Sequence, residues 1–553
     1  MTHINTPRPA STPALQAKRL VSGLTLAIGL SFLTLPAYSQ APQSGLALTP
    51  EMVDGLGFAV SDDDPLGAST WEGVSRDTVF QLVSRLPETY ISRPLRSLAR
   101  RLLTAPSAPP TQPPPAPSLL ALRLAKLTAL GDAASVDALL KQVPPRYAPE
   151  EMARVRAEHF FLTGKDSEAC AQIEAYRNNV DPYWMNSRVA CLALSDKARD
   201  AVSALAPLIR DGLEDETIRV LVERLAGRRV DVPTDLEMSP AAVALYAKSG
   251  RIPSAPELDH MSGAAARAFA EMTLPGRLAA AESAARQGSL SLDRLKALYD
   301  AALQKSDPKD ASDAPLARAR ALRLAETNND PVKKADALAT AFDLAENVGL
   351  LPVMAELSVP VLQKLTPAPN LVQHAPRFAR MLLLAGDQNG ALAWAKSLHE
   401  AAGSDPALAD QALRLSILTG LAAPDIAGPL DPAQISDWAL LAGDGGQSAA
   451  LLLATMQGLG DPIPSPLWDV LPPQLPLVPQ PIDDAVVWMR LPSAAHSGRI
   501  GEALALSLIL TRGETVPSSE PLRLSLAVSA LRQLGLEVEA RRIAVEAAVM
   551  AGL

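Results

Sequence analysis

Two cysteines are the residues whose type and number most directly predict chemistry in this sequence. Cys170 and Cys191 are the only cysteines in 553 residues. An even count in an oxidising compartment predicts a disulfide. The alternatives are a redox pair, a pair of metal ligands or two unpaired thiols. Redox motifs separate their cysteines by two residues, and no cluster of histidines and cysteines accompanies this pair, so we favour a structural disulfide.

The positions of the two cysteines fit a hairpin of helices. We expect one helix over residues 166–177 and a second that begins at Asp181-Pro182. The point midway between Cys170 and Cys191 falls in the turn that joins these helices. In an antiparallel hairpin both cysteines then lie at the same height, which a bridge with Cα atoms about 5–6 Å apart requires. Closing a loop of about 20 residues stabilises a fold by roughly 3 kcal/mol.

The other reactive side chains form no recognisable constellation. Histidines are scattered and show neither HxH nor HExxH spacing, so we expect no metal site and no cofactor. A GxSxG elbow and a phosphate-binding loop are absent. So is the catalytic Glu-Ser followed by a Gly-Leu-Met-Gln-like segment that is typical of lytic transglycosylases. Carboxylates are numerous but diffuse. We therefore expect no catalytic residues. The tryptophans within helical segments are expected in the core, with sugar-stacking platforms as the alternative; they are Trp184, Trp394, Trp438 and Trp488.

The N-terminal segment, residues 1–39, has the pattern of a secretory signal. A basic, acid-free stretch precedes an apolar run over residues 20–35, and small residues follow at Ala37 and Ser39. We expect cleavage between Ser39 and Gln40, export by the general route, and a soluble protein in the bacterial periplasm. The alternative is a retained membrane anchor, but the run is shorter than the roughly 20 apolar residues that a span needs.

The charge and composition narrow the classes of partner and fold. The formal net charge is −9, and it becomes −12 when the three basic residues of the signal segment are removed. An acidic surface repels phosphates, so we expect no nucleic-acid partner. Aromatic residues make up only 4% of the chain, and alanine and leucine dominate. This composition favours helices over strands.

Prolines and glycines indicate where those helices begin and end. Six prolines follow an N-capping Asp or Ser, which predicts a helix start; the pairs are Asp181-Pro182, Ser239-Pro240, Asp307-Pro308, Asp330-Pro331, Asp405-Pro406 and Asp431-Pro432. Five glycines end an apolar helical stretch and precede a small or compact apolar residue five positions later. They are Gly131, Gly164, Gly386, Gly498 and Gly535. This pattern predicts one helix turning tightly into the next.

The segments around these glycines resemble the helix junction of tetratricopeptide repeats. The resemblance is carried by LTGKDSEACAQIEAY (162–176), LAGDQNGALAWAKSL (384–398) and SGRIGEALALSLIL (497–510). The interval from Gly131 to Gly164 is close to that family's period of about 34 residues, although other intervals are irregular and the family's aromatic positions are mostly missing. The resemblance implies an all-α fold, a right-handed α-solenoid of antiparallel helix pairs, and an adaptor role.

Composition divides the chain into six parts. We expect a signal peptide (1–39), a small helical N-terminal unit (40–104), a proline-rich linker (105–118), the solenoid (119–460), a proline-rich insertion (461–482) and C-terminal repeats (483–553). The insertion is expected to pack along the array, with a ligand for another protein's groove as the alternative.

The N-terminal unit contains a basic amphipathic helix. Around its leucine stripe lie Arg93, Arg96, Arg100 and Arg101. Such a face can touch an anionic membrane surface or an acidic partner. The simpler interpretation is a solvated face on a packed helix. Any membrane contact is expected only here, weakly, or through the signal segment.

Two functions remain open from the sequence. The preferred one is a non-catalytic scaffold that binds an envelope protein or polymer on its helical-repeat surface. The alternative is an enzyme, or a subunit of one, that acts on peptidoglycan or another envelope polysaccharide. That alternative needs two convergent carboxylates.

Overall fold

A computed structural model describes most of the chain from Pro50 to Leu553. The residues described are 50–58, 64–106, 117–144, 147, 149–233, 237–251, 253–271, 276–305, 313–441, 446–469, 485–514 and 521–553. Contacts divide the chain into one unit from Met1 to Ala47 and one from Leu48 to Leu553. The predicted signal segment and the bond between Ser39 and Gln40 lie outside the described residues. All the described residues lie in the second unit.

Every regular element in the described ranges is a helix, which confirms the all-α class. The first half of the unit contains α1 (Pro50–Asp54), α2 (Arg76–Ser84), α3 (Arg93–Thr104), α4 (Leu119–Ala129), α5 (Ala133–Gln142), α6 (Glu150–Leu162), α7 (Asp166–Ala175), α8 (Pro182–Leu194), α9 (Ala198–Asp211), α10 (Glu216–Leu225), α11 (Pro240–Lys248), α12 (Ala255–His260), α13 (Gly263–Glu271), α14 (Arg277–Arg286) and α15 (Leu292–Lys305).

The second half contains α16 (Ala314–Thr327), α17 (Pro331–Glu346), α18 (Leu351–Leu362), α19 (Ala375–Leu384), α20 (Gln388–Ala402), α21 (Ala409–Ala422), α22 (Pro424–Ala427), α23 (Pro432–Leu441), α24 (Gln447–Leu459), α25 (Pro466–Asp469), α26 (Ala485–His496), α27 (Ile500–Thr511), α28 (Pro521–Gln533) and α29 (Glu537–Met550). Two 3₁₀ turns, η1 (Pro369–His374) and η2 (Pro406–Leu408), complete the set. None of the described helices combines the length and apolar character needed to cross a bilayer.

Short capping residues start many of these helices. The side chains of Asp181 and Asp330 accept hydrogen bonds of 2.9 Å from backbone N–H groups at the starts of α8 and α17. A proline follows each cap in the first turn of the helix. Backbone N–H groups in that turn have no intrahelical acceptor, so a proline, which lacks the N–H, loses no hydrogen bond there. Five of the six proline pairs begin a helix or 3₁₀ turn, as predicted. The pair at 307–308 lies outside the described residues.

Glycines in the left-handed region join successive helices. The five glycines singled out in the sequence stand between α4 and α5, α6 and α7, α19 and α20, α26 and α27, and α28 and α29, with φ between 67° and 84°. Only glycine adopts this region without a steric cost. The chain can therefore reverse direction in a few residues, and the two helices of each pair pack against each other.

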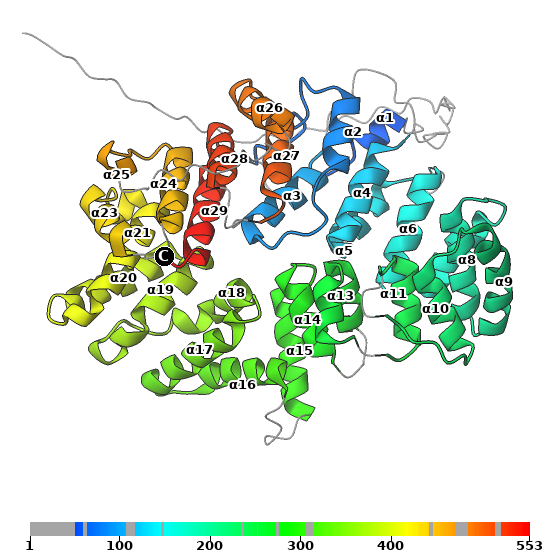
Figure 1. The fold of residues 1–553 in the computed structure, drawn as a ribbon, viewed down its shortest axis with the longest axis horizontal. Helices are drawn as coiled ribbons and strands as arrows, with labels where there is room; N and C mark the ends of the chain where they lie inside the picture. The colour runs from blue at the N-terminus through cyan, green and yellow to red at the C-terminus, as the bar shows by residue number, and fades with distance from the viewer. Residues whose placement is uncertain are drawn as a thin grey trace, which may run out of the picture. The chain divides into compact units, whose positions relative to one another are not determined.

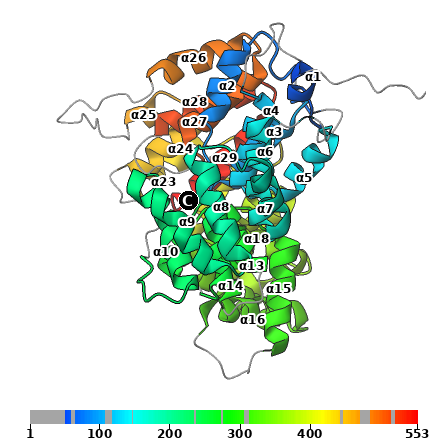
Figure 2. The same cartoon turned by 90° about the vertical axis from the view of Figure 1, so that its right-hand side faces the viewer.

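The path of the chain brings its last helices back to its first ones. Consecutive helices pack along most of the sequence, for example α16 on α17 and α19 on α20. In addition, α27 packs against α2 and α3, and α29 packs against α3, α19 and α21. Figures 1 and 2 show the blue N-terminal helices beside the orange and red C-terminal ones. The buried core follows the whole path as a single apolar cluster.

Two glycines at the ends of α27 make this return possible. The Gly501 N–H donates a 2.7 Å hydrogen bond to the carbonyl oxygen of Thr70. The carbonyl oxygen of Gly513 accepts from the N–H groups of Ile91 and Ser92 at 3.1 and 3.2 Å. The N-terminal segment is thus joined to α27 backbone to backbone, which requires residues without side chains at the contact.

A buried arginine attaches α4 to the helices before it. The Arg123 guanidinium is 1% exposed and donates to four carbonyl oxygens at 2.8–3.1 Å, which belong to Asp54, Leu56, Leu103 and Ala105. These oxygens lie at the ends of α1 and α3. Most of the proline-rich stretch between α3 and α4 lies outside the described residues, but the helices on its two sides pack together.

Candidate functional site

A cavity of about 600 Å³ lies where helices from both ends of the unit meet. Its wall comes from α3, the start of α5, α13, the connection from α14 to α15, α18, the end of α19, and α29. Figure 1 shows these elements facing one another around the middle of the unit. Two of the predicted repeat turns, Gly131 and Gly386, form part of the wall.

The wall is rich in arginine. Six arginines line it among the described residues, namely Arg93, Arg96, Arg100, Arg267, Arg294 and Arg542. Four acidic side chains accompany them, namely Asp132, Glu271, Glu356 and Glu546. The wall therefore carries two more positive than negative charges, although the whole chain has a net charge of −9. A positive cavity in an acidic chain attracts anions to one place.

Three of the six arginines are held by carboxylates. Arg93 pairs with Glu356 at 2.6 Å, Arg100 with Asp132 at 2.5 Å, and Arg294 with Glu271 at 2.5 Å. Each pair joins two elements that are distant in the sequence or separated by a turn. These three pairs fix the wall.

The other three arginines are held less firmly. Arg96 donates to the carbonyl oxygens of Tyr90 and Arg286 at 3.4 and 3.5 Å. Arg267 donates to the Leu162 carbonyl oxygen at 3.5 Å, and its Nε is buried without a hydrogen-bond partner. In the described part of the chain, Arg542 makes no hydrogen bond. These guanidinium groups retain donors that a ligand can use.

Burial and neighbouring charges shift the pKa values of several arginines and of one glutamate in this wall. Burial lowers the pKa of Arg96 to about 10, and repulsion by Arg93 and Arg100 acts in the same direction. Burial also lowers the pKa of Arg93 and of Arg267. Burial raises the pKa of Glu356, and its arginine neighbours counteract part of that rise. Arg96 stays charged at neutral pH, since a pKa of about 10 lies far above it.

Glycines let two of the arginines lie against the backbone. A Cβ atom placed on Gly288 would stand 1.8 Å from Cζ of Arg96. A Cβ atom on Gly386 would stand 3.1 Å from Nη2 of Arg542. Both glycines have positive φ, 71° and 84°. The turns therefore position the helices and also leave space for the guanidinium groups.

Guanidinium and carboxylate groups make up the charged part of the lining. Among the described residues of the wall there is no histidine, cysteine, lysine or tyrosine. The Ser289 hydroxyl donates to the carbonyl oxygens of Gly263 and Ala284 and is not held by a base. Within the described residues no group of three histidine, cysteine or acidic side chains could share a metal ion. Guanidinium groups in such a wall recognise carboxylates and phosphates, often through two parallel hydrogen bonds.

The predicted disulfide is present but lies away from the cavity. Cys170 in α7 and Cys191 in α8 are bonded, with Cα atoms 5.6 Å apart. In the same hairpin the rings of Tyr176 and Trp184 stack at 4.4 Å. None of these residues lines the cavity. The bridge therefore acts on the stability of this hairpin.

The remaining candidate residues have structural surroundings. His159 is buried with Nε2 2.8 Å from Asp137, and the ring of His374 stacks on Phe378. Trp184, Trp394 and Trp438 are at most 2% exposed and belong to the core, as their helical positions indicated. Trp488 is half-buried.

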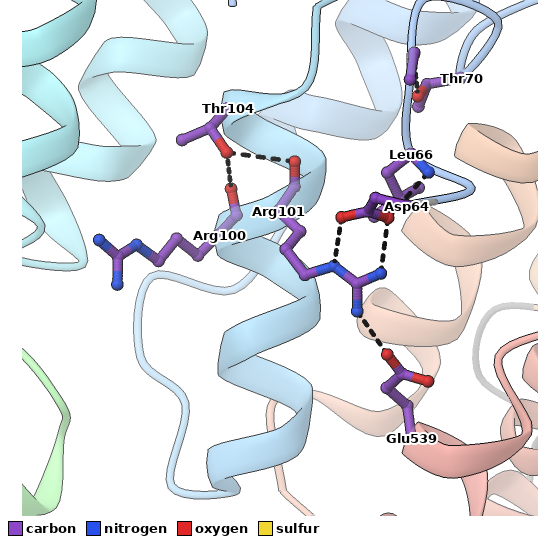
Figure 3. Close-up of polar contacts among 8 residues, drawn as sticks. Asp64, Leu66, Thr70, Arg100, Arg101, Thr104 and Glu539 are labelled. Carbon is purple, nitrogen blue, oxygen red and sulfur yellow. Dashed lines mark hydrogen bonds and ion pairs between the residues drawn. The ribbon is translucent and has the colours of Figure 1, made fainter. Parts of the chain in front are cut away.

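The structure separates the four arginines of the basic helix into two groups. Arg93, Arg96 and Arg100 line the cavity, whereas Arg101 binds Asp64 and Glu539 on the other side of α3. Figure 3 shows Arg100 and Arg101 leaving the helix in opposite directions. Sequence reasoning identified the α3 arginines and missed Arg267, Arg294 and Arg542, because nothing local indicates that their helices face α3.

Comparison with known proteins gives no match. No family model, no curated protein and no solved structure matches this chain. Its function therefore has to be argued from the cavity and the helices that form it.

Proposed function

We propose that this chain is an exported, non-catalytic binding scaffold of the bacterial periplasm, and that a partner protein or polymer docks at the arginine-lined cavity. The observation that carries the proposal is the inversion of charge. A chain with a net charge of −9 gathers six arginines in one cavity. Ion pairs between arginine and carboxylate account for only three of them.

The repeated helix pairs support a scaffold role. The five turn glycines at positive φ and the packing of consecutive helices are what tetratricopeptide-like hairpins require. On this proposal the hairpins form a right-handed α-solenoid, whose wall offers a continuous surface to an extended partner.

Export is the second part of the proposal. The basic flank, apolar run and small residues before Gln40 are the features of a signal peptide. The disulfide supports the same compartment, because such bonds persist in the periplasm and are rare in the cytosol. Fractionation followed by mass measurement of the mature N-terminus tests it. A protein that starts at Gln40 in the periplasmic fraction is expected, and a cytosolic protein that keeps residues 1–39 would overturn it.

The carboxylates of the wall favour binding over catalysis. A polysaccharide hydrolase needs two carboxyl groups free to act on one bond. Glu271 and Glu356 are each bound to an arginine at 2.5 and 2.6 Å. Asp132 is likewise paired with Arg100 at 2.5 Å. These pairs hold the carboxylates to guanidinium groups, which opposes their action as acid and base. This arrangement favours binding over hydrolysis.

Site-specific cross-linking tests the docking site. A photo-reactive amino acid replaces Ser97, which is exposed and lines the cavity. The matched control replaces Ser203, which is exposed on α9 outside the cavity. In intact cells, a discrete cross-linked partner is expected from position 97 and not from position 203. No partner at position 97, or the same products from both positions, would contradict the proposal.

A further inference from the structure

We propose that the cavity binds a phosphate group that carries about two negative charges, and that Arg96 and Arg542 are its main ligands with Arg267 as a third. This inference rests on the proposed function, since it names the chemistry by which the partner would be recognised. Three features support it: the charges of the wall, the position of the free donors and the chemistry of the anion.

The charge of the wall leaves room for one doubly charged anion. Six arginines face four acidic side chains, an excess of two positive charges. Like charges held this close in a partly buried site repel one another, and the depressed pKa of Arg96 reflects that repulsion as well as burial. An anion with two negative charges neutralises the excess. A phosphate monoester carries about −1.5 to −2 at neutral pH.

The donors that are free come from two helices far apart in the sequence. Arg96 lies on α3 and Arg542 on α29, the helices that meet when the chain returns to its start. Both act electrostatically on the same carboxylate, Glu356 of α18, together with Arg93. Three guanidinium groups thus surround one carboxylate, which already binds Arg93 at 2.6 Å. An anion in the cavity is attracted by Arg96 and Arg542 in the same way as Glu356 is.

The turn glycines fix where these two donors are. Arg96 lies over Gly288, and Arg542 lies over Gly386. A side chain at either glycine would occupy the space of the guanidinium group, and the positive φ of both glycines disfavours any other residue. The turn that ends α14 and the turn that ends α19 therefore each leave room for one guanidinium group, from α3 and from α29. The fold therefore fixes the positions of these two donors, unlike those of arginines on an open surface.

Phosphate is favoured over a single carboxylate by the groups already present. The wall contains four carboxylates of its own, and they do not neutralise it. A ligand with one carboxylate would add one negative charge and leave one positive charge over. A phosphate group has three acceptor oxygens and forms paired hydrogen bonds with guanidinium groups. A cavity of about 600 Å³ is also within the usual range for small-molecule sites, so the phosphate can be part of a larger molecule.

Calorimetric titration of the purified, disulfide-intact protein tests the inference. The probes are inorganic phosphate, glycerol 3-phosphate, sulfate and succinate at matched ionic strength and pH 7.5. The two phosphate probes separate free phosphate from a phosphate monoester, and succinate represents a dicarboxylate. We expect saturable binding of at least one phosphate probe, tighter than either sulfate or succinate.

Three variants locate the binding. Arg542→Gln removes an exposed guanidinium that makes no hydrogen bond among the described residues, so its fold should be unchanged. Arg96→Gln removes the second donor. Arg210→Gln is the control, because Arg210 is exposed on α9 and lies outside the cavity. We expect each cavity variant to weaken phosphate binding by at least about tenfold, as the loss of one charge-assisted hydrogen bond implies, and the control to bind as the parent does.

Several results would overturn the inference. They are the absence of saturable phosphate binding, tighter binding of succinate or sulfate than of both phosphate probes, and unchanged binding by Arg542→Gln. The outcome is independent of the cross-linking test. Phosphate binding without a cross-linked partner would support the phosphate site and contradict the scaffold function. A cross-linked partner at position 97 without phosphate binding would contradict the phosphate site and support the scaffold function.

Discussion

Arg101 and Glu539 form an ion pair of 2.5 Å although 438 residues separate them in the sequence. The same guanidinium binds both carboxylate oxygens of Asp64 at 2.6 and 3.0 Å (Figure 3). Arg101 lies on α3 and Glu539 on α29, so this arginine joins the start of the described chain to its end. Arg93, Arg96 and Arg100, on the same helix, line the cavity. The contact that closes the path of the chain also holds the cavity wall.

The first prediction concerns Arg101→Gln. Its side chain is 16% exposed and that of Asp64 only 4%, so the substitution leaves a buried carboxylate without its cation. Breaking such a pair costs about 3–5 kcal/mol, toward the lower end where solvent reaches one partner. Urea unfolding should show this loss. Amide exchange should quicken in α2, α3, α27 and α29.

An exposed arginine supplies the control for that experiment. Arg177→Gln removes a pair with Glu174 in which the two side chains are 69% and 67% exposed. Such pairs contribute little to stability, so we expect only a small change in the free energy of unfolding, at most about 1 kcal/mol. If Arg101→Gln behaves like Arg177→Gln, the ion pairs of Arg101 do not hold the two ends together.

The second prediction is the pH dependence of Asp64→Asn. Burial by itself raises the pKa of Asp64, but hydrogen bonds from Arg101 and the Leu66 N–H lower it more, so the folded pKa lies below the ordinary 3.8. A group with a lowered pKa stabilises the fold above its unfolded pKa, and that contribution is lost as the pH falls through the folded value. The stability difference between the parent and Asp64→Asn should be full at pH 7.

That difference should then shrink as the pH falls below about 4, when the parent carboxylate becomes protonated. Urea unfolding of both proteins between about pH 7 and pH 3 measures it. Other carboxylates titrate in this range in both proteins and cancel in the comparison. A difference that stays constant down to pH 3 would show that the charge of Asp64 is not what stabilises the contact.

Local features of this fold could be predicted from sequence because they depend on neighbouring residues. Asp181 followed by Pro182 starts a helix whatever surrounds it, since the cap satisfies N–H groups that have no other partner. Gly131 ends a helix because glycine adopts a positive φ without a steric cost, which also does not depend on the rest of the fold. The disulfide between Cys170 and Cys191 could also be predicted. In an antiparallel hairpin, two residues equally far from the turn along the chain lie opposite each other.

The cavity could not be predicted from the sequence in the same way. The leucine stripe of α3 shows that one face is buried but does not identify the helix that covers it, and α29 lies at the opposite end of the sequence. Arg96 was therefore interpreted as part of a basic face without its counterpart Arg542. Gly288 was missed as a turn because Asp293, five residues later, breaks the small-residue pattern.

The third prediction concerns the disulfide. The bond between Cys170 and Cys191 closes a loop with a sequence separation of 21, and its loss should destabilise the hairpin by about 3 kcal/mol. The double variant Cys170→Ser/Cys191→Ser, measured by urea unfolding, should match the parent under reducing conditions. A free-thiol assay on protein isolated from cells with its thiols blocked at lysis should find no reactive thiol. Two reactive thiols would show that the bond does not form in the cell.

The fourth prediction compares two glycines of one turn, Gly498 and Gly501. Gly498 has a φ of 67° and nothing within 4 Å of an added Cβ, so Gly498→Ala meets only backbone strain of about 1–2 kcal/mol. A Cβ on Gly501 would lie 2.5 Å from the Thr70 carbonyl oxygen and 2.7 Å from the Trp71 ring. Gly501→Ala therefore pushes the N-terminal segment away from α27, at a cost of about 1–3 kcal/mol.

Because the two costs are similar in size, overall stability does not separate the variants. The location of the change does. In Gly501→Ala, amide exchange should quicken at residues 64–74, where the hydrogen bond from the Gly501 N–H to Thr70 is lost. In Gly498→Ala, the ratio between amide exchange in residues 64–74 and exchange in the rest of the chain should be the same as in the parent. Equal exchange of residues 64–74 in both variants would mean that the close approach at Gly501 does not hold the N-terminal helices to the C-terminal ones.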